Sequence, residues 1–547
     1  MAGANPGLDR AVFILPEGAS RVVGRNALLT NIAVGYAVSE IIRSTLGPNG
    51  MNKCMVNDLG DVIITNDGAT ILEEINVSHP IAKMMVEAAK TQDKQVGDGT
   101  TTATLIAGNL LKQAGELIEK NVAPAVIIRG YEKAMKKAQE IIKEKLAFKL
   151  NVDEDKPILE QIAFIAMGSK GIGEKKTRRK LAEIVVNACL QVAEKRDGKY
   201  VIDKDLIKIE KKAGGDIYET ELVNGIVVDK EVVHADMPRY IKEAKIALIA
   251  APLEIEKTEI DAKIQITSPE QMEAFLKQEE KMLKELVEKI KSTGANVVFC
   301  QKGIDEVAQH FLAKEGILAV RRVKKSDMEK LSRATGARIV STVDDLSDKD
   351  LGEAQVVEEV KVAGESMIFV RGCKNPKSVT IFVRGGSDHV VSEVERAIVD
   401  AIGATSAAIE QGLYVTGGGS VESALSVLLR DYAAEIGGRE QLAIQAFADA
   451  LEIIPATLAE NSGMDPIDVL VELRSRHKKG EHTMGVNALE GKVDDMKALG
   501  ILEPAAVKLQ AVASGAEIAN MILKVDDVIS ARIKENKSKG NEEPPEF

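Results

Sequence analysis

The stretch Gly97-Asp98-Gly99-Thr100-Thr101-Thr102 decides the interpretation of this chain, and a second acidic glycine turn, Asn66-Asp67-Gly68-Ala69-Thr70, precedes it by about 30 residues. Each turn places a carboxylate on a loop whose glycines allow the backbone to approach a ligand closely. Exposed N–H groups and threonine hydroxyls donate to phosphate oxygens, and aspartate is an oxygen ligand for Mg²⁺. The pair predicts a magnesium-nucleotide pocket, although either turn alone is common loop punctuation.

The residues after the second turn predict a buried helix, because 101–113 would form a nearly continuous apolar face. The helix would then begin at the Gly97–Thr102 turn itself. A helix N-terminus presents unpaired N–H groups and the positive end of the helix dipole. A phosphate group is therefore expected at this turn.

Two further features belong to the same prediction. Asp400 lies among apolar residues of a predicted helix that follows an apolar strand at 379–383. An isolated carboxylate of this kind is a candidate general base, but Asp400 taken alone is more often an ordinary solvated helix-face residue. Gly417-Gly418-Gly419 lies between a short strand and another helix, which again suits close approach by a ligand.

The chain is helical at both ends and mixed in the middle. A helix is predicted over 27–46, ending at Gly47-Pro48, and a hairpin over 56–65. Short buried strands are predicted at 246–249 and 296–299. Between those strands, Ser268-Pro269-Glu270-Gln271 is typical of a capping box that opens a highly charged helix reaching about Ser292.

Three apolar side chains, Met272, Phe275 and Leu276, share one face of that charged helix by their i, i+3, i+4 spacing. One interpretation is packing against the parent domain. The other is an apolar tip that contacts partner or client proteins.

Composition limits the class of protein. At 547 residues, two to four domains are expected, and 45% hydrophobic residues with 3% aromatics and no Trp favour helix-rich layers. A net charge of -12 argues against nucleic-acid binding. Four scattered cysteines without CxxC spacing, no secretory signal and no membrane-length apolar run predict a cytosolic protein. The polar stretch 534–547 is expected to be a mobile tail.

Several familiar sites are absent from the sequence. It contains no GxxxxGK[ST], HExxH, GxSxG or kinase HRD motif. His477 and His482 are close enough in sequence to suggest a metal site, but chance is the better explanation of a pair alone.

Taken together, the motifs resemble the group II chaperonins, the archaeal thermosome and its eukaryotic cytosolic relatives, over almost the whole chain. The resemblance rests on five motifs in order: Leu46-Gly47-Pro48-Asn49-Gly50-Met51-Asn52-Lys53, Asn66-Asp67-Gly68-Ala69-Thr70, Gly97-Asp98-Gly99-Thr100-Thr101-Thr102, Gly417-Gly418-Gly419 with Glu422, and Gly500-Ile501-Leu502-Glu503-Pro504.

The resemblance implies a multi-domain chaperonin fold with an α-helical equatorial domain and α/β intermediate and apical domains. Residues 1–150 and 405–534 would form the equatorial ATP-binding domain, and 151–220 and 372–404 the intermediate hinge domain. Residues 221–371 would form the apical client-binding domain, with a helical protrusion at 254–292. Residues 535–547 would be a disordered tail.

The resemblance also assigns roles to individual residues. Asp67 and Asp98 would be the Mg²⁺ carboxylates, Asp400 would deprotonate the attacking water, and Lys170 would sense the γ-phosphate. Gly99, Thr100, Thr101 and Thr102 would bind phosphate, and we call Gly97–Thr102 the phosphate turn. Leu46, Gly47 and Pro48 would form the opposite wall. Gly418, Asn487 and Glu503 would hold ribose and adenine.

The implied activity is an ATP-driven folding chamber: a double ring of like subunits, alone or with paralogues, that encloses non-native proteins beneath a built-in lid. ATP and Mg²⁺ are the implied cofactors, with K⁺ as a further cation; neither nucleic acid nor a membrane is implied. Two alternatives stay open at this point. One is a passive ring that only holds aggregating proteins, and the other is a soluble phosphotransferase, which the lack of an acceptor-binding motif disfavours. The sequence lacks a Gly/Met repeat in its tail and has Ser420 where the family often has Ala.

Overall fold

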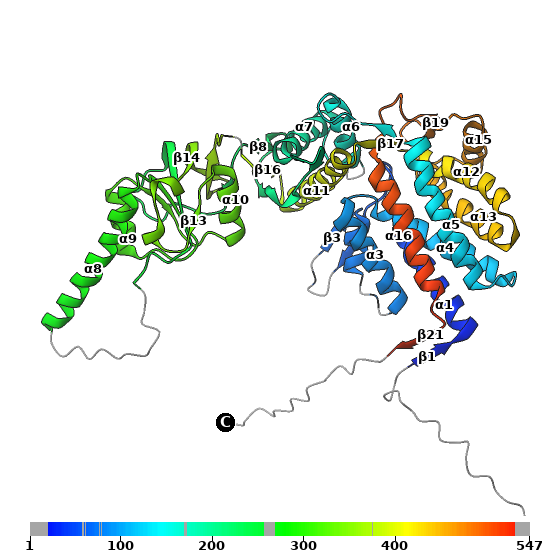
Figure 1. Ribbon diagram of the computed structural model, residues 1–547, viewed down its shortest axis with the longest axis horizontal. Coiled ribbons are helices and arrows are strands. Elements are labelled where there is room, and N and C mark those ends of the chain that lie inside the picture. The colour runs from blue at the N-terminus through cyan, green and yellow to red at the C-terminus, as the bar shows by residue number, and fades with distance from the viewer. Residues whose placement is uncertain are drawn as a thin grey trace, which may run out of the picture.

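The computed structural model describes residues 20–56, 60, 62–75, 77, 79–168, 172–255, 269–374 and 376–530. These residues form three units arranged in a row, which we call the helical, middle and sheet units (Figure 1). The first and last parts of the chain meet in the helical unit. The sheet unit is at the opposite end, with the middle unit between them.

The helical unit contains two long segments of the chain. The first comprises β1 (Ser20–Val23), α1 (Gly24–Arg43), β2 (Lys53–Val56), β3 (Val62–Thr65), α2 (Gly68–Glu74), α3 (Pro80–Val96), α4 (Thr100–Glu119), α5 (Pro124–Ile141), a π-helical turn (Ile142–Leu146) and β4 (Phe148–Lys149). The second comprises β17 (Leu413–Thr416), α12 (Ser420–Ile436), α13 (Gly438–Leu451), α14 (Ile453–Asn461), α15 (Pro466–Lys478), β18 (Met484–Asn487), β19 (Lys492–Asp495), β20 (Leu502–Pro504), α16 (Ala505–Leu523) and β21 (Asp527–Ser530).

The core of the helical unit explains why the two ends of the chain come together. α4 is buried almost all round, and α1, α3, α5 and α16 pack against it. In Figure 1, α16, in red, runs beside the cyan helices α4 and α5. Tyr131 and Phe447, two of the largest fully buried side chains, meet edge to face at 5.6 Å and join α5 to α13. The terminal strands β1 and β21 pair antiparallel, with Arg21 opposite Ile529.

One helical stretch among the described residues, Gly438–Asn461, spans α13 and α14 and is long and apolar enough to cross a membrane. In this fold 72% of its most apolar window is buried. The stretch therefore serves as part of the protein core.

The middle unit has a three-stranded sheet in the order β7-β16-β8, with helices beside it. β16 runs parallel to β7, with Val379 opposite Ile207. The elements of the middle unit are α6 (Lys156–Ala166), α7 (Lys175–Val192), β5 (Glu194–Arg196), β6 (Lys199–Val201), β7 (Ile207–Ala213), β8 (Glu221–Val223), β16 (Val379–Gly385) and α11 (Asp388–Gln411).

The sheet unit is built on a seven-stranded mixed sheet in the order β12-β11-β10-β14-β15-β9, with β13 also paired to β10. The helix α8 projects from it (Figure 1). The elements of the sheet unit are β9 (Val227–Val228), β10 (Tyr240–Ile249), α8 (Pro269–Ser292), β11 (Val297–Cys300), α9 (Glu306–Lys314), β12 (Leu318–Val320), α10 (Lys325–Thr335), β13 (Ile339–Val340), β14 (Gly352–Val362) and β15 (Glu365–Arg371).

The sequence predictions of local structure agree closely with these elements. The predicted helix at 27–46 is α1, which ends at Arg43 because Thr45 and Leu46 turn into the Gly47-Pro48 segment. The predicted hairpin is β2 and β3, and the two predicted buried strands lie in β10 and β11, which pair in parallel.

Candidate nucleotide site

Asp67 lies at the N-terminus of α2, in the first of the two acidic turns. Its Oδ2 accepts hydrogen bonds from the backbone N–H of Thr70 at 2.9 Å and from the Thr70 hydroxyl at 2.7 Å. The Asp67 N–H in turn donates to the Thr65 hydroxyl at 3.1 Å. These bonds fix the direction of the carboxylate, which is only partly exposed.

Asp98 lies in the second turn, immediately before α4. Its Oδ1 accepts from the Gly99 N–H at 2.6 Å. Gly99 is the N-cap of α4 with φ +80°, and as a glycine it has no side chain with which to cap this helix. The first N–H groups of a long buried helix, at Thr100, Thr101 and Thr102, therefore point out of its N-terminus beside the Asp98 carboxylate.

The two acidic turns lie against each other. A methyl group placed on Gly68 would be 2.6 Å from the Thr101 hydroxyl oxygen and 3.1 Å from that of Thr100. Only a glycine allows this approach, so the turns that carry Asp67 and Asp98 are adjacent.

Asp400 lies on α11, and this helix packs directly on the second turn. A methyl group on Gly403 would be 2.7 Å from the Gly97 Cα and 2.8 Å from the Val96 carbonyl oxygen. Asp400 is three residues before Gly403, and residues at i and i+3 share one face of a helix. Asp400 is half-buried and lies about one helical turn, roughly 5 Å, from this backbone contact.

The third glycine run, Gly417–Gly419, adjoins two predicted nucleoside contacts. A methyl group on Gly417 would be 2.5 Å from Glu503 Oε1. The Gly418 carbonyl accepts from the Val486 N–H at 2.8 Å, which places Asn487, the next residue of β18, beside the run. Asn487 is buried, and its Oδ1 accepts from the Glu490 N–H at 3.2 Å.

The segment Leu46-Gly47-Pro48 lies beside the hairpin formed by β18 and β19. The Asn49 amide donates to the Ala488 carbonyl at 2.7 Å, and the Leu46 carbonyl accepts from the Asn461 amide at 2.9 Å. Gly47 has φ +84° and packs on Leu458 of α14. This segment is therefore held beside β18 and β19.

Adjacent residues of α16 join the phosphate turn to the third glycine run. A methyl group on Gly99 would be 2.7 Å from Val507. The next residue, Lys508, binds Glu422 Oε1 at 2.9 Å and Glu503 Oε2 at 2.8 Å, and these carboxylates flank the glycine run. Both glycine segments therefore lie at the start of α16.

The buried ion pairs of Lys508 were not predicted from the sequence. The side chains of Lys508 and Glu422 are 5% and 2% exposed. Burial alone would lower the pKa of Lys508, but the charges of Glu422 and Glu503 outweigh it and raise this pKa. The available sequence signal was the one lysine of the Ala505–Leu523 helix, which lies among apolar residues in its first five positions.

Two sets of predicted residues lie elsewhere. Lys170 falls outside the described residues. Met272, Phe275 and Leu276 are 51%, 43% and 57% exposed on α8, far from the glycine turns in Figure 1. The predicted tail at 535–547 and Ser268 of the predicted capping box also lie outside the described residues.

The residues present fit a magnesium nucleotide better than a metal held by protein alone. Within the described part of the chain, no group of three or more His, Cys, Asp or Glu side chains could hold a metal ion. Mg²⁺ typically takes one or two carboxylates and completes its shell with phosphate oxygens and water. Asp67 and Asp98, beside the N-terminus of α4, supply that number of carboxylates together with phosphate donors.

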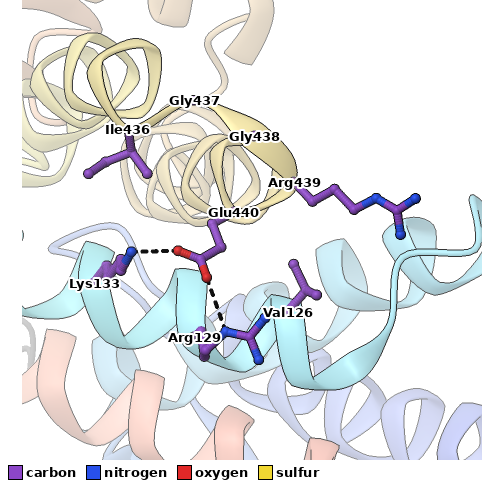
Figure 2. Close-up of a pocket in the computed structure, with 8 residues that line it drawn as sticks. All are labelled: Val126, Arg129, Lys133, Ile436, Gly437, Gly438, Arg439 and Glu440. Carbon is purple, nitrogen blue, oxygen red and sulfur yellow. Dashed lines mark hydrogen bonds and ion pairs between the residues drawn. The ribbon is translucent and has the colours of Figure 1, made fainter.

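A cavity of about 320 Å³ lies at a different place, between α5 and the start of α13 (Figure 2). Glu440 bridges Arg129 at 3.0 Å and Lys133 at 2.5 Å there, and these cations lower the Glu440 pKa. The charges that line it are thus partly paired, and none of its residues belongs to the glycine turns.

Comparison with known proteins identifies the family. Residues 38–532 match the model of the TCP-1/cpn60 chaperonin family. The chain is 59% identical to a thermosome subunit of Methanopyrus kandleri over 526 residues, which cover 96% of each chain. It is 56% identical to a thermosome subunit of Pyrococcus abyssi over 97% of this chain and 96% of that one. It is also 56% identical to a thermosome subunit beta of Archaeoglobus fulgidus over 98% of both.

These matches confirm the predicted chaperonin fold class and the predicted function as an ATPase and ATP-dependent chaperone. They also support nucleotide use and assembly into rings that bind client proteins. The chain belongs to the TCP-1/cpn60 chaperonin family and, within it, to the group II chaperonins.

Proposed function

We propose that the chain is a subunit of a double-ring folding chamber in the cytoplasm, with domains divided as the sequence suggests. Residues 1–150 and 405–534 would form the equatorial domain, 151–220 and 372–404 the intermediate domain, and 221–371 the apical domain. Of the four buried cores among the described residues, the three larger ones support this division, and the largest contains residues from both ends of the chain.

ATP with Mg²⁺ is the proposed ligand of the glycine turns. Asp67 and Asp98 would hold Mg²⁺, which neutralises phosphate charge when bound. The N–H and hydroxyl groups of Thr100–Thr102 would bind phosphate oxygens, and Leu46–Pro48 would form the facing wall. Gly418, Asn487 and Glu503 would contact the nucleoside, and K⁺ is a second cation to test.

Asp400 is the proposed general base. The observation that carries this assignment is the backbone contact between Gly403 and Gly97, which sets the Asp400 face of α11 against the phosphate turn. A carboxylate held there would orient water and accept its proton as the terminal phosphate is attacked. Lys170 is the proposed γ-phosphate sensor, and this role rests on the resemblance of the sequence to the family.

Movement of α11 would couple hydrolysis to the lid. α11 contacts β7 and β16 in the middle unit and also α3 and α16 in the helical unit. The middle unit is joined to the sheet unit by the buried ion pair of Lys208 and Asp327, at 2.8 Å. A shift of α11 toward the nucleotide would therefore move the sheet unit and α8, whose exposed Met272, Phe275 and Leu276 would contact clients when the ring is open.

Release of inorganic phosphate from ATP tests this proposal. Asp400→Asn should retain nucleotide binding and lower hydrolysis by about 10²–10⁴-fold, the range typical of a lost general base. Asp388→Asn removes an exposed carboxylate from the first turn of the same helix and should hydrolyse ATP like wild type. Equal activity in all three proteins would show that Asp400 is not the base.

A further inference from the structure

Gln92 is a fully buried polar residue next to the phosphate turn, and neither the motifs nor the proposed catalytic roles include it. It lies on α3, five residues before Gly97, with 0% of its surface exposed. A buried amide is retained at such a position only when its donors and acceptor are satisfied. Its partners therefore indicate what it does.

The Gln92 side chain connects the phosphate turn to α16. Its Nε2 donates to the Asp98 carbonyl oxygen at 3.0 Å. Its Oε1 accepts from the Ser514 hydroxyl at 3.5 Å, and the Gln510 amide donates to that hydroxyl at 2.9 Å. A line of side chains from α16 thus ends on the backbone of Asp98.

Asp98 is restrained at both its backbone carbonyl and its side-chain carboxylate. The carbonyl is held by Gln92, while the carboxylate accepts from the Gly99 N–H at 2.6 Å. The turn has little other freedom, because a methyl group on Gly99 would be 3.3 Å from Gln92 Nε2 and 2.7 Å from Val507. On the far side of the turn, Gly97 is pressed against Gly403.

We propose that Gln92 is a positioning residue that sets the Asp98 carboxylate for the divalent cation of the bound nucleotide. The inference rests on the proposed Mg²⁺ role of Asp98 and extends it to a residue that does not touch the ligand. Residues that orient a metal ligand through a hydrogen bond commonly change metal affinity by about 10–100-fold when removed. Gln92 acts here through the backbone of Asp98. Its removal should therefore weaken the part of the nucleotide affinity that depends on the metal.

The experiment measures the dissociation constant of a non-hydrolysable ATP analogue by calorimetry on the assembled protein, once in excess Mg²⁺ and once in EDTA. The ratio of the two constants is the gain in affinity due to the metal. Gln92→Met has a similar volume without the amide, and it should lower this ratio about tenfold while the constant in EDTA stays near that of wild type. Gln510→Met removes an amide that donates to Ser514 and makes no hydrogen bond to Asp98, and it should keep the wild-type ratio.

The outcomes separate the inference from the function on which it rests. A wild-type ratio near one, or an Asp98→Ala variant with the wild-type ratio, would overturn the Mg²⁺ assignment itself. A large wild-type ratio that is lost in Asp98→Ala but retained in Gln92→Met would overturn only the positioning role. If Gln92→Met does not assemble, Gln92→Asn, which withdraws the amide by one methylene, gives the same test. A lower melting temperature with an unchanged ratio would mean that Gln92 is only structural.

Discussion

Gly97 and Gly403 are 306 positions apart in the sequence, yet their backbones touch: a methyl group on Gly403 would lie 2.7 Å from the Gly97 Cα. Gly97 belongs to the turn that carries Asp98, and Gly403 belongs to the helix that carries Asp400. The proposed phosphate and general-base residues are thus joined by a contact that admits no side chain.

Gly403→Ala should therefore impair turnover. In an ordinary helix interior, Gly→Ala stabilises by about 0.5–1 kcal/mol, but here the new methyl group must separate α11 from the turn. A displacement of about 1 Å at a reacting centre can cost on the order of 100-fold, so we expect the steady-state ATPase rate to fall at least tenfold. Gly386→Ala is the control, since no atom lies within 4 Å of the added methyl group. Equal ATPase rates in the Gly403→Ala and Gly386→Ala variants would show that hydrolysis does not depend on this contact.

Lys508 should be essential for stability of the helical unit. Lys508→Met would leave the buried Glu422 and the partly exposed Glu503 around a missing charge, and breaking a buried pair in this way costs about 3–5 kcal/mol. The melting temperature should drop by several degrees, and nucleotide affinity should fall because the third glycine run loses its support. Lys524→Met, at the exposed C-terminal end of the same helix, should melt like wild type. Unchanged melting of Lys508→Met would contradict the importance of these ion pairs.

His477 predicts a specific sensitivity to acid. Burial and the neighbouring His482 lower the pKa of His477 to about 4, from about 6.5 in an unfolded chain. Between those values the unfolded chain binds more protons, so stability is complete above pH 6.5 and declines as the pH falls toward 4. The total loss is about 3 kcal/mol for this one group.

Melting curves between pH 7 and pH 4.5 test this sign. His477→Gln should lose less melting temperature on acidification than wild type, whereas His389→Gln, an exposed residue of α11, should follow wild type. Parallel curves for wild type and His477→Gln would show that His477 does not contribute to acid sensitivity.

The exposed face of α8 should affect client capture and leave ATP hydrolysis unchanged. Replacing Met272, Phe275 and Leu276 together with Ser removes the apolar surface at the tip of the sheet unit. Suppression of aggregation of a denatured protein, followed by light scattering, should weaken while phosphate release stays at the wild-type rate. Replacing Glu273 and Lys277 with Ser on the same helix breaks only an exposed ion pair at 2.8 Å and should leave capture intact.

The sequence predicted what depends on local chemistry. Gly99 before an apolar run predicted a helix that begins at the phosphate turn, and α4 begins at Thr100. Helical periodicity and the Gly47-Pro48 pair located α1 to within three residues at each end. These features follow from propensities and end signals that act over a few residues.

Contacts between distant segments were beyond the same reasoning. Gly403 is an unremarkable helix glycine until the fold places it on Gly97, and Lys508 pairs with Glu422 across 86 positions. Gln92 gives no signal in the sequence, because a glutamine in a helical run is ordinarily exposed. In each case tertiary packing determines the role, and no short-range pattern encodes it.

The most direct test of the account is ATP-dependent recovery of a chemically denatured model enzyme by wild type and by Asp400→Asn. Hydrolysis-coupled folding predicts recovery with wild type and ATP, and only suppressed aggregation without recovery in the variant. Equal recovery by both proteins, or suppressed aggregation by both without any effect of ATP, would contradict the account and leave a passive holding ring.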